Sequence, residues 1–410
     1  MEKISISESI TSDDFVDIKE ITDFQEEILY ISINQTQTFI AMGTKTGFKL
    51  FIISPPQLFY ESKCGPIKIV EMLNSTNLVL LVGQNEIGDF SPRKGTIYQI
   101  KDNTVICSFW PFSNPITLAK LNKQRIILLE NTTIHIFSTN DMKSLHSLDI
   151  GINNLSNSII YNNNNINFNN KICLSSSSDK NNFLIYSSSE SEGIIKVYDL
   201  LYLTYKTTIQ AHKGPIEQMN INSNGDLLVT SSVKGTTIRV FSLPKGDKLY
   251  TFRRGIANAK IFSINFDIET NSKIVLLSNT GTIHIFDLGK KQYLDNNNNR
   301  KKSSDFYFND EKFNEKNNNK GIFGYVTDFV KKSNLISKDY EDIYNYERPI
   351  ISGNFSDIKT KNIICFNGNN TNEIITVNEN GIYHSFSVNY KKNSISKIMK
   401  ETLDELKLIV

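Results

Sequence analysis

Cysteine is scarce in this sequence of 410 residues. Its four cysteines are widely scattered and form no CxxC pair: Cys64, Cys107, Cys173 and Cys365. A fold organised by a disulfide framework, or by a zinc site built from cysteine pairs, is therefore disfavoured. We expect reduced thiols that fill core positions, as in a cytosolic protein, with disulfide bonds as the alternative.

Long apolar runs and an excess of one charge are also missing. No apolar run approaches the ~18 residues that a membrane-spanning helix needs, and residues 1–5 lack the basic start and apolar stretch of a signal peptide. Lysine and arginine number 45 against 43 acidic residues, a net charge of +2. No global field therefore favours nucleic acid, and any anion site must be local. We expect a soluble, cytoplasmic protein whose membrane contacts are peripheral.

A short pattern recurs along the whole chain: a small or turn residue, then a strand that alternates around Ile, Val and Phe. Its seven copies are TGFKLFIIS (46–54), GTIYQIKD (95–102), TTIHIFST (132–139), EGIIKVYDL (192–200), GTTIRVFSL (235–243), GTIHIFDL (281–288) and NGIYHSFSV (380–388). Before most copies there is another β-prone stretch, and a turn separates the two. Successive strands joined by turns are typical of the meander in a propeller blade. The sequence therefore predicts an all-β fold, a single seven-bladed β-propeller of the WD type over residues 1–410.

Two intervals between copies exceed the roughly 40–45 residues of a WD-type blade. The first contains the asparagine-rich stretch 161–170, and the second contains residues 289–348, which we expect to form a long loop inserted in blade 6. Such tracts cannot pack a core, so they are interpreted as loops. Helical stretches are expected only within the second insertion and at the C-terminus, over residues 395–407.

Chemistry-bearing motifs of enzymes are absent from the sequence. It contains no metal-ligand spacing, no glycine-rich phosphate loop and no plausible catalytic triad. We therefore expect no catalytic residues, no metal and no cofactor. His135, His146 and His384 have no partner cluster and are interpreted as structural.

The sequence motifs that indicate a function are concentrated in residues 211–286, where KGTTIRVF, KLYTFRRG and NTGTIHIF follow one another. This stretch resembles the PROPPIN family, WD-repeat β-propellers that bind phosphoinositides and include the autophagy-related protein 18 group. The family's hallmark is a Phe/Leu-Arg-Arg-Gly motif, present here at residues 252–255. The resemblance implies recognition of phosphatidylinositol 3-phosphate and phosphatidylinositol 3,5-bisphosphate.

The two arginines of this motif, Arg253 and Arg254, are consecutive. Successive side chains of a strand point to opposite faces, so the two should equip separate pockets. Each guanidinium offers paired donors that suit phosphate oxygens, and Gly255 is expected to allow a tight turn beside them. The resemblance implies a first site of His212, Thr230, Ser232, Gly235, Thr236, Arg239 and Arg253. It implies a second site of Arg254, Gly255, Ser278, Thr282 and His284.

These residue types also have ordinary structural roles. An isolated Arg-Arg pair is usually solvated, histidines often orient WD-repeat turns, and hydroxyl-rich segments are common in blade turns. The occurrence of all of them in adjacent blades, in the family's order, favours a headgroup site.

The blade 6 insertion contains a segment that is typical of membrane interfaces. Residues 290–320 carry eight basic and five acidic side chains, and GIFGYVTDFVKKS follows at 321–333. Apolar residues there recur at helical spacing, with polar residues opposite, which predicts a short basic amphipathic helix. We expect membrane insertion through Ile322, Phe323, Tyr325, Val326, Phe329 and Val330. The alternative is a helix that packs back on the propeller.

The sequence and the resemblance together predict a non-enzymatic peripheral membrane protein. It is expected to bind phosphoinositide-containing membranes at phagophore or preautophagosomal and endosomal sites and to recruit autophagy-related proteins, including the family's lipid-transfer protein. The stretch SFWPFSNP (108–115) is a candidate surface for contact with these partner proteins, although its Trp110 suits a core position equally well. The competing hypothesis is a WD-repeat protein-interaction scaffold that does not bind lipid.

Overall fold

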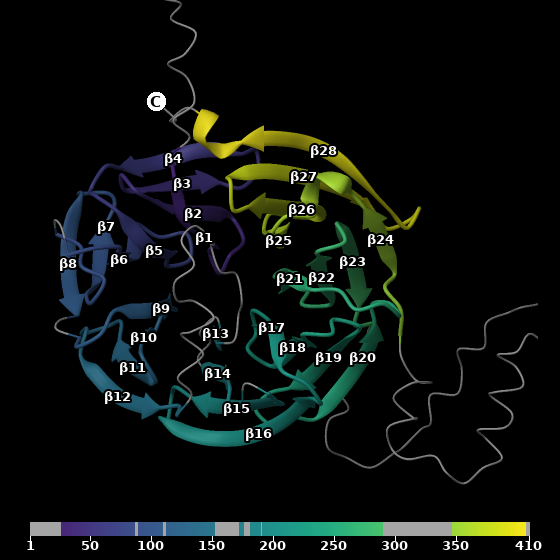
Figure 1. Cartoon of the computed structure of the whole chain (residues 1–410), viewed down its shortest axis with the longest axis horizontal. Coiled ribbons are helices and arrows are strands. Elements are labelled where there is room, and N and C mark those ends of the chain that lie inside the picture. Colours follow the sequence, from purple (N-terminus) through teal and green to yellow (C-terminus); the bar gives the residue numbers. More distant parts are fainter. Residues whose placement is uncertain are drawn as a thin grey trace, which may run out of the picture.

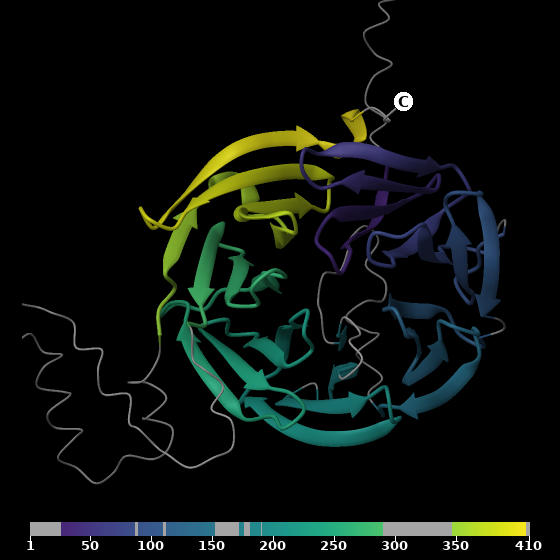
Figure 2. The same ribbon diagram turned by 180° about the vertical axis from the view of Figure 1, so that it is seen from behind.

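A computed structural model describes residues 26–86, 89–109, 112–151, 172–175, 181–189, 191–289 and 347–406. They form seven four-stranded antiparallel sheets, each built from four consecutive strands. The sheets stand around a common centre like the blades of a propeller (Figure 1), and the ring is equally evident from behind (Figure 2). The predicted seven-bladed all-β propeller is confirmed.

Strands β1 to β16 build the first four blades. Blade 1 contains β1 (Ile28–Ile33), β2 (Phe39–Thr44), β3 (Phe48–Ile52) and β4 (Gln57–Ser62). Blade 2 contains β5 (Ile67–Met72), β6 (Leu78–Gly83), β7 (Gly95–Gln99) and β8 (Thr104–Phe109). Blade 3 contains β9 (Ile116–Leu121), β10 (Arg125–Glu130), β11 (Thr133–Ser138) and β12 (Ser144–Asp149). Blade 4 contains β13 (Ile172–Leu174), β14 (Phe183–Ser187), β15 (Gly193–Asp199) and β16 (Thr204–His212).

Strands β17 to β28 complete the ring. Blade 5 contains β17 (Ile216–Ile221), β18 (Leu227–Ser232), β19 (Thr237–Ser242) and β20 (Lys248–Arg253). Blade 6 contains β21 (Ile261–Phe266), β22 (Lys273–Ser278), β23 (Thr282–Asp287) and β24 (Ile351–Asn354). Blade 7 contains β25 (Asn362–Asn367), β26 (Asn370–Asn378), β27 (Ile382–Asn389) and β28 (Ser394–Thr402). Two 3-10 turns, η2 (Ser356–Ile358) and η3 (Leu403–Glu405), follow blades 6 and 7.

The repeated sequence pattern corresponds to one strand of every blade. All seven copies contain the third strand, from β3 in blade 1 to β27 in blade 7. This strand pairs with the second and the fourth strand of its own sheet, and its two faces meet the neighbouring blades. Apolar residues are therefore required on both faces, which explains why the pattern is the part of the blade that the sequence repeats best.

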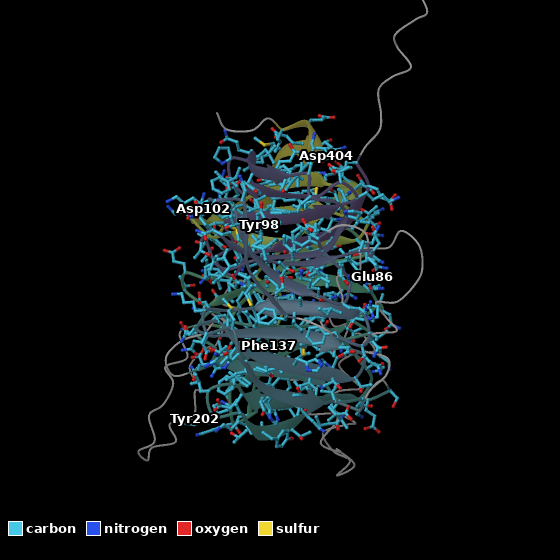
Figure 3. All side chains as sticks on the ribbon, turned by 90° about the vertical axis from the view of Figure 1, so that its left-hand side faces the viewer. Glu86, Tyr98, Asp102, Phe137, Tyr202 and Asp404 are labelled. Atoms are coloured by element: carbon cyan, nitrogen blue, oxygen red, sulfur yellow. The ribbon has the colours of Figure 1, made fainter. Side chains whose placement is uncertain are left out.

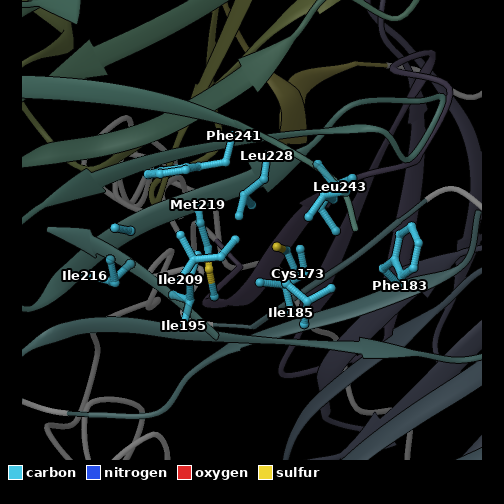
Figure 4. Packing of buried hydrophobic residues seen from close by; sticks show 13 residues of the cluster. Cys173, Phe183, Ile185, Ile195, Ile209, Ile216, Met219, Leu228, Phe241 and Leu243 are labelled. Atoms are coloured by element: carbon cyan, nitrogen blue, oxygen red, sulfur yellow. The ribbon is translucent and has the colours of Figure 1, made fainter. Parts of the chain in front are cut away.

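The hydrophobic core is divided among the interfaces between blades. Each pair of neighbouring blades buries a cluster of its own. Figure 4 shows the cluster between blades 4 and 5, where Ile195 and Ile209 of blade 4 meet Met219, Leu228 and Phe241 of blade 5. Burial of this apolar surface holds the blades in fixed register, so functional groups at an interface keep fixed positions.

The four cysteines are free thiols, as predicted. Cys173 and Cys365 are buried in the interface clusters, whereas Cys64 and Cys107 are only half-buried. The expectation of core thiols therefore holds for two of the four.

Seen edge-on, the molecule is a disc with two faces (Figure 3). Loops between second and third strands, and loops between blades, lie on one face, which carries Glu86. Loops between third and fourth strands lie on the opposite face, where Figure 3 shows Asp102 and Tyr202. We call these the Glu86 face and the Tyr202 face. Strands that alternate in direction place connections on the two faces in turn.

The C-terminal helix expected over residues 395–407 is wrong. This segment forms β28, which pairs with β27 along its whole length, and then η3. A register shift in the ladder opposite Ser385 and Phe386 breaks the strict alternation of β28. Ile395 and Met399 stand four residues apart, a spacing that imitates one face of a helix. The shift instead sends them to opposite faces of the sheet, Ile395 to the cluster between blades 6 and 7 and Met399 to the cluster between blades 7 and 1.

Several predictions fall on segments outside the described residues. β23 and β24 pair in one sheet, so the insertion 289–348 separates the third and fourth strands of blade 6. The predicted amphipathic helix with its six membrane-inserting residues, the stretch 161–170 and Trp110 all lie outside the described part of the chain. Within the described residues, no helix is long and apolar enough to cross a membrane.

Candidate functional site

The direction of each arginine follows from the packing of Phe252 in β20. Its ring contacts that of Phe286 in blade 6, with centroids 4.8 Å apart. Because side chains alternate along a strand, Arg253 must point away from blade 6, toward blade 4. Arg254 continues the ladder through a hydrogen bond from its amide to the carbonyl of Thr236, at 3.0 Å, and its side chain points toward blade 6. The predicted divergence of the two arginines therefore agrees with the register.

The first group of residues lies between blades 4 and 5. Thr230, Arg239 and Thr251 are directly paired across β18, β19 and β20. Paired residues share one face of a sheet, and Arg253, two residues beyond Thr251, shares it as well. Nε2 of His212, at the end of β16 in blade 4, lies 2.9 Å from Oγ1 of Thr230. The interface therefore brings two guanidinium-bearing side chains to the same face as an imidazole and a hydroxyl.

The positive charge of this group comes from arginine alone. Burial of His212, followed by the nearby charge of Arg239, lowers the pKa of its imidazole to about 3. The ring is therefore neutral at physiological pH, and its hydrogen bonds are those of an uncharged imidazole. A guanidinium N–H of Arg239 donates to the carbonyl oxygen of Ala211 at 2.6 Å, which holds the cation beside His212.

The second group lies between blades 5 and 6. Nε of Arg254 donates to the carbonyl oxygen of Gly235 at 2.6 Å, and a terminal guanidinium nitrogen donates to that of Ala257. Burial, followed by the positive charge of Arg254, lowers the pKa of His284 to about 4. Nδ1 of His284 lies 2.8 Å from Oγ of Ser352 in β24.

A row of hydroxyl groups borders the second group at the turn between β22 and β23. Oγ of Ser278 lies 2.7 Å from Oγ1 of Thr280, which in turn lies 3.0 Å from Oγ1 of Thr282. Hydroxyls both donate and accept hydrogen bonds. Such a row can therefore satisfy an oxygen-rich ligand next to the Arg254 guanidinium.

The turn between β18 and β19 stands between the two groups. Gly235 and Thr236, predicted for the first site, accept hydrogen bonds from Arg254 of the second through their carbonyl oxygens. Ser232, at the start of the turn, accepts a 2.8 Å hydrogen bond from the amide of Gly235. The turn therefore borders both groups and fixes the distance between them.

The two glycines of the predicted sites differ in what their backbone requires. Gly235 has φ of +59°, and a Cβ there would lie 1.9 Å from the carbonyl oxygen of Ala259. Only glycine fits such a position without strain. Gly255 has no positive φ, and a Cβ there would meet nothing within 4 Å. A turn beside the arginines therefore does not require glycine at residue 255, because the backbone leaves open space there.

Sequence reasoning missed four residues of the two groups. Thr251 joins the first group through strand register, and Gly193 pairs with His212, where a Cβ would overlap the His212 backbone. Thr280 links two predicted hydroxyls, and Ser352 bonds His284. Thr251 could have been found from the period of the strand. Ser352 carries no local signal, because 68 residues separate it from its partner.

A comparison with protein families found a match to the PROPPIN family over residues 28–309. Among curated proteins, the chain is 38% identical over 265 residues to autophagy-related protein 18 of Dictyostelium discoideum, covering 65% of this chain and 66% of the relative. It is 34% identical over 284 residues to autophagy-related protein 18 of Yarrowia lipolytica, covering 64% and 67%.

Solved structures support the same fold. Kluyveromyces lactis Hsv2 superposes with a TM-score of 0.66 at 17% identity, covering 92% of this chain and 99% of that one. KlAtg21, in a complex with the coiled coil of AgAtg16, superposes with a TM-score of 0.64 at 20% identity. This match also covers 92% of this chain and 99% of the other. At these identities the likeness concerns the propeller architecture.

The family follows from the extent of these matches. The matched region exceeds half of the chain, while the alignments span about two thirds of the length of the two curated relatives. The family consists of non-enzymatic β-propellers that bind phosphoinositides, which confirms the prediction that the chain is not an enzyme. The chain, with its seven blades and its Phe-Arg-Arg-Gly motif, belongs to the PROPPIN family.

Proposed function

We propose that this chain is a peripheral membrane protein that recognises phosphatidylinositol 3-phosphate and phosphatidylinositol 3,5-bisphosphate and recruits autophagy machinery during autophagosome formation. The observation that supports it best is the divergence of Arg253 and Arg254 to the two sides of β20. Arg253 shares its sheet face with Thr230, which contacts the buried His212 of blade 4, and the charge of Arg254 lowers the pKa of the buried His284 in blade 6.

The chemistry of each pocket fits an inositol phosphate. The guanidinium supplies charge-assisted, paired hydrogen bonds to phosphate oxygens, each contributing about 1.5–3 kcal/mol. The neutral imidazoles and the hydroxyls of Ser278, Thr280 and Thr282 suit the ring hydroxyls, which need both donors and acceptors. A pocket of this composition prefers a phosphorylated sugar alcohol to an inorganic cation or an apolar ligand.

Two pockets on one chain make membrane attachment bivalent. Binding of the first headgroup turns binding of the second into an encounter within one membrane plane, so the avidity exceeds either affinity. The insertion 289–348 is proposed as a third attachment, in which an amphipathic helix carrying Tyr325 and Phe329 enters the bilayer. This segment lies outside the described residues, and the proposal rests on its sequence.

The proposed partners are phosphoinositide membranes and autophagy-related proteins, among them the lipid-transfer protein of the family. The relatives named autophagy-related protein 18, and the complex of KlAtg21 with the coiled coil of AgAtg16, support partners of this kind. The proposed location is the cytoplasm, with recruitment to phagophore, preautophagosomal and endosomal membranes.

Liposome flotation tests this function directly. The full chain and an Arg253→Thr/Arg254→Thr variant are compared on phosphatidylcholine vesicles with and without phosphatidylinositol 3-phosphate. We expect the wild type to float only with the phosphoinositide and the variant to remain at the bottom. Equal flotation of both would contradict the proposal and favour a WD-repeat scaffold that binds proteins without lipid.

A further inference from the structure

Two apolar side chains project from neighbouring loops beside the candidate pockets. Ile256 is 87% exposed, more than any other large hydrophobic residue among the described ones, and Val233 is 50% exposed. Each stands next to a pocket residue in the sequence, Ile256 after Gly255 and Val233 after Ser232. Exposure of a large aliphatic side chain to water is unfavourable, so their position beside the pockets needs an explanation.

Backbone hydrogen bonds hold the loops that carry these side chains. The amide of Val233 donates to the carbonyl of Pro215 at 3.0 Å, and the amide of Ala259 donates to that of Lys234 at 3.1 Å. Three consecutive connections, 213–215, 233–236 and 254–260, are thereby joined. They are loops between blades or between second and third strands, so the strand order places all three on the Glu86 face. The apolar tips therefore have a fixed place next to Arg254.

The surroundings of the two tips are basic. Lys213, Lys234 and Lys260 are exposed on the same three loops. Lys260 forms an ion pair with the buried Glu217 at 3.6 Å, so these two charges offset each other and Lys213 and Lys234 carry the basic character of the three loops. Aliphatic tips ringed by lysines match the interface of a bilayer with anionic headgroups, where methylene chains lie directly beneath phosphates.

We propose that Ile256 and Val233 form an apolar wedge that enters the bilayer interface when the pockets bind their headgroups. This inference rests on the proposed function, because the pockets bring the wedge to the membrane. It differs from the insertion 289–348, which joins β23 to β24 in blade 6. At the end of that insertion, the backbone of Glu347 pairs with Thr251 and Arg253 of β20, so the chain returns beside the candidate sites.

Vesicle binding of Ile256→Ser and Val233→Ser tests the wedge. Vesicles contain phosphatidylcholine, phosphatidylserine and phosphatidylinositol 3-phosphate, and soluble inositol 1,3-bisphosphate is titrated in parallel. Loss of one buried aliphatic side chain should weaken vesicle binding about tenfold for Ile256→Ser and less for Val233→Ser. Affinity for the soluble headgroup should not change. The control is Tyr202→Ser, which removes a 74% exposed side chain from the Tyr202 face and should leave vesicle binding unchanged.

A second measurement reports insertion itself. Tryptophan fluorescence of Ile256→Trp should be quenched by vesicles with brominated acyl chains, whereas that of Tyr202→Trp should not. If wild type binds these vesicles but Ile256→Ser and Val233→Ser bind them equally well, the wedge is overturned and a protein partner becomes the better occupant of the two tips. If wild type fails to bind phosphoinositide vesicles at all, the proposed function falls together with the wedge.

Discussion

Nε of Arg254 lies 2.6 Å from the carbonyl oxygen of Gly235. One residue directly follows the outer strand of blade 5, and the other forms the left-handed corner between β18 and β19, with φ of +59°. The conformation of the glycine therefore sets the direction of the guanidinium. The candidate site between blades 5 and 6 depends on this backbone contact as much as on the arginine itself.

Replacement of Gly235 should harm stability and the second pocket together. In Gly235→Ala, the new Cβ would lie 1.9 Å from the carbonyl oxygen of Ala259 in a left-handed conformation. We expect a loss of about 1–3 kcal/mol in the free energy of unfolding, measured by urea denaturation, and weaker headgroup binding through Arg254.

Gly255→Ala is the matched control, because its Cβ would meet nothing within 4 Å. This variant should unfold at the wild-type urea concentration. A loss of stability equal to that of Gly235→Ala would show that the difference between the two glycines has been misassigned.

Stability should depend on pH through the buried histidines. Burial and the neighbouring arginines lower the pKa of His212 to about 3 and that of His284 to about 4, whereas an unfolded chain titrates near 6.5. Below that pH the unfolded chain binds more protons than the folded one, so the free energy of unfolding falls as pH falls. From pH 7 to pH 5 the loss should be on the order of 1–2 kcal/mol for each histidine.

Urea denaturation of wild type and His284→Gln at the two pH values isolates one of these contributions. Carboxylates elsewhere affect both proteins alike, so the variant should lose less stability than wild type on acidification. The same loss in both would mean that His284 is not held neutral by the fold.

The insertion in blade 6 can be tested without affecting the pockets. In Phe329→Asp, a charged side chain replaces an aromatic one on the apolar side of the predicted amphipathic helix, and a charge is costly in the bilayer interior. Vesicle flotation should weaken while titration with soluble inositol 1,3-bisphosphate stays unchanged. Equal weakening of both would show that the helix packs against the propeller instead.

Much of the fold could be predicted because the third strand of each blade is apolar on both faces. The resulting apolar pattern repeats in the sequence, and it predicted the positions of β19 and β23 correctly. β28 escaped prediction because Ile395 and Met399 are spaced as on one face of a helix, whereas a register shift places them on opposite faces of the sheet. The sequence alone could not show that pairing with β27 overrides that local pattern.

Some features of the candidate site could likewise be predicted from the sequence, and others could not. Alternation along β20 predicted the opposite directions of Arg253 and Arg254, since it depends only on the period of a strand. The contact of His284 with Ser352 joins residues on either side of a long insertion, and no local pattern reveals it. The sequence could not show that the fold requires glycine at residue 235 and not at residue 255, because that need depends on φ and on neighbouring atoms, which appear only in the folded chain.

Counting headgroups per chain tests the two-pocket arrangement most directly. Isothermal titration with soluble inositol 1,3-bisphosphate should give two bound headgroups for the wild type, one for Arg253→Gln, one for Arg254→Gln and none for the double variant. A single bound headgroup in the wild type, lost equally in either single variant, would mean that both arginines serve one pocket and would contradict the account.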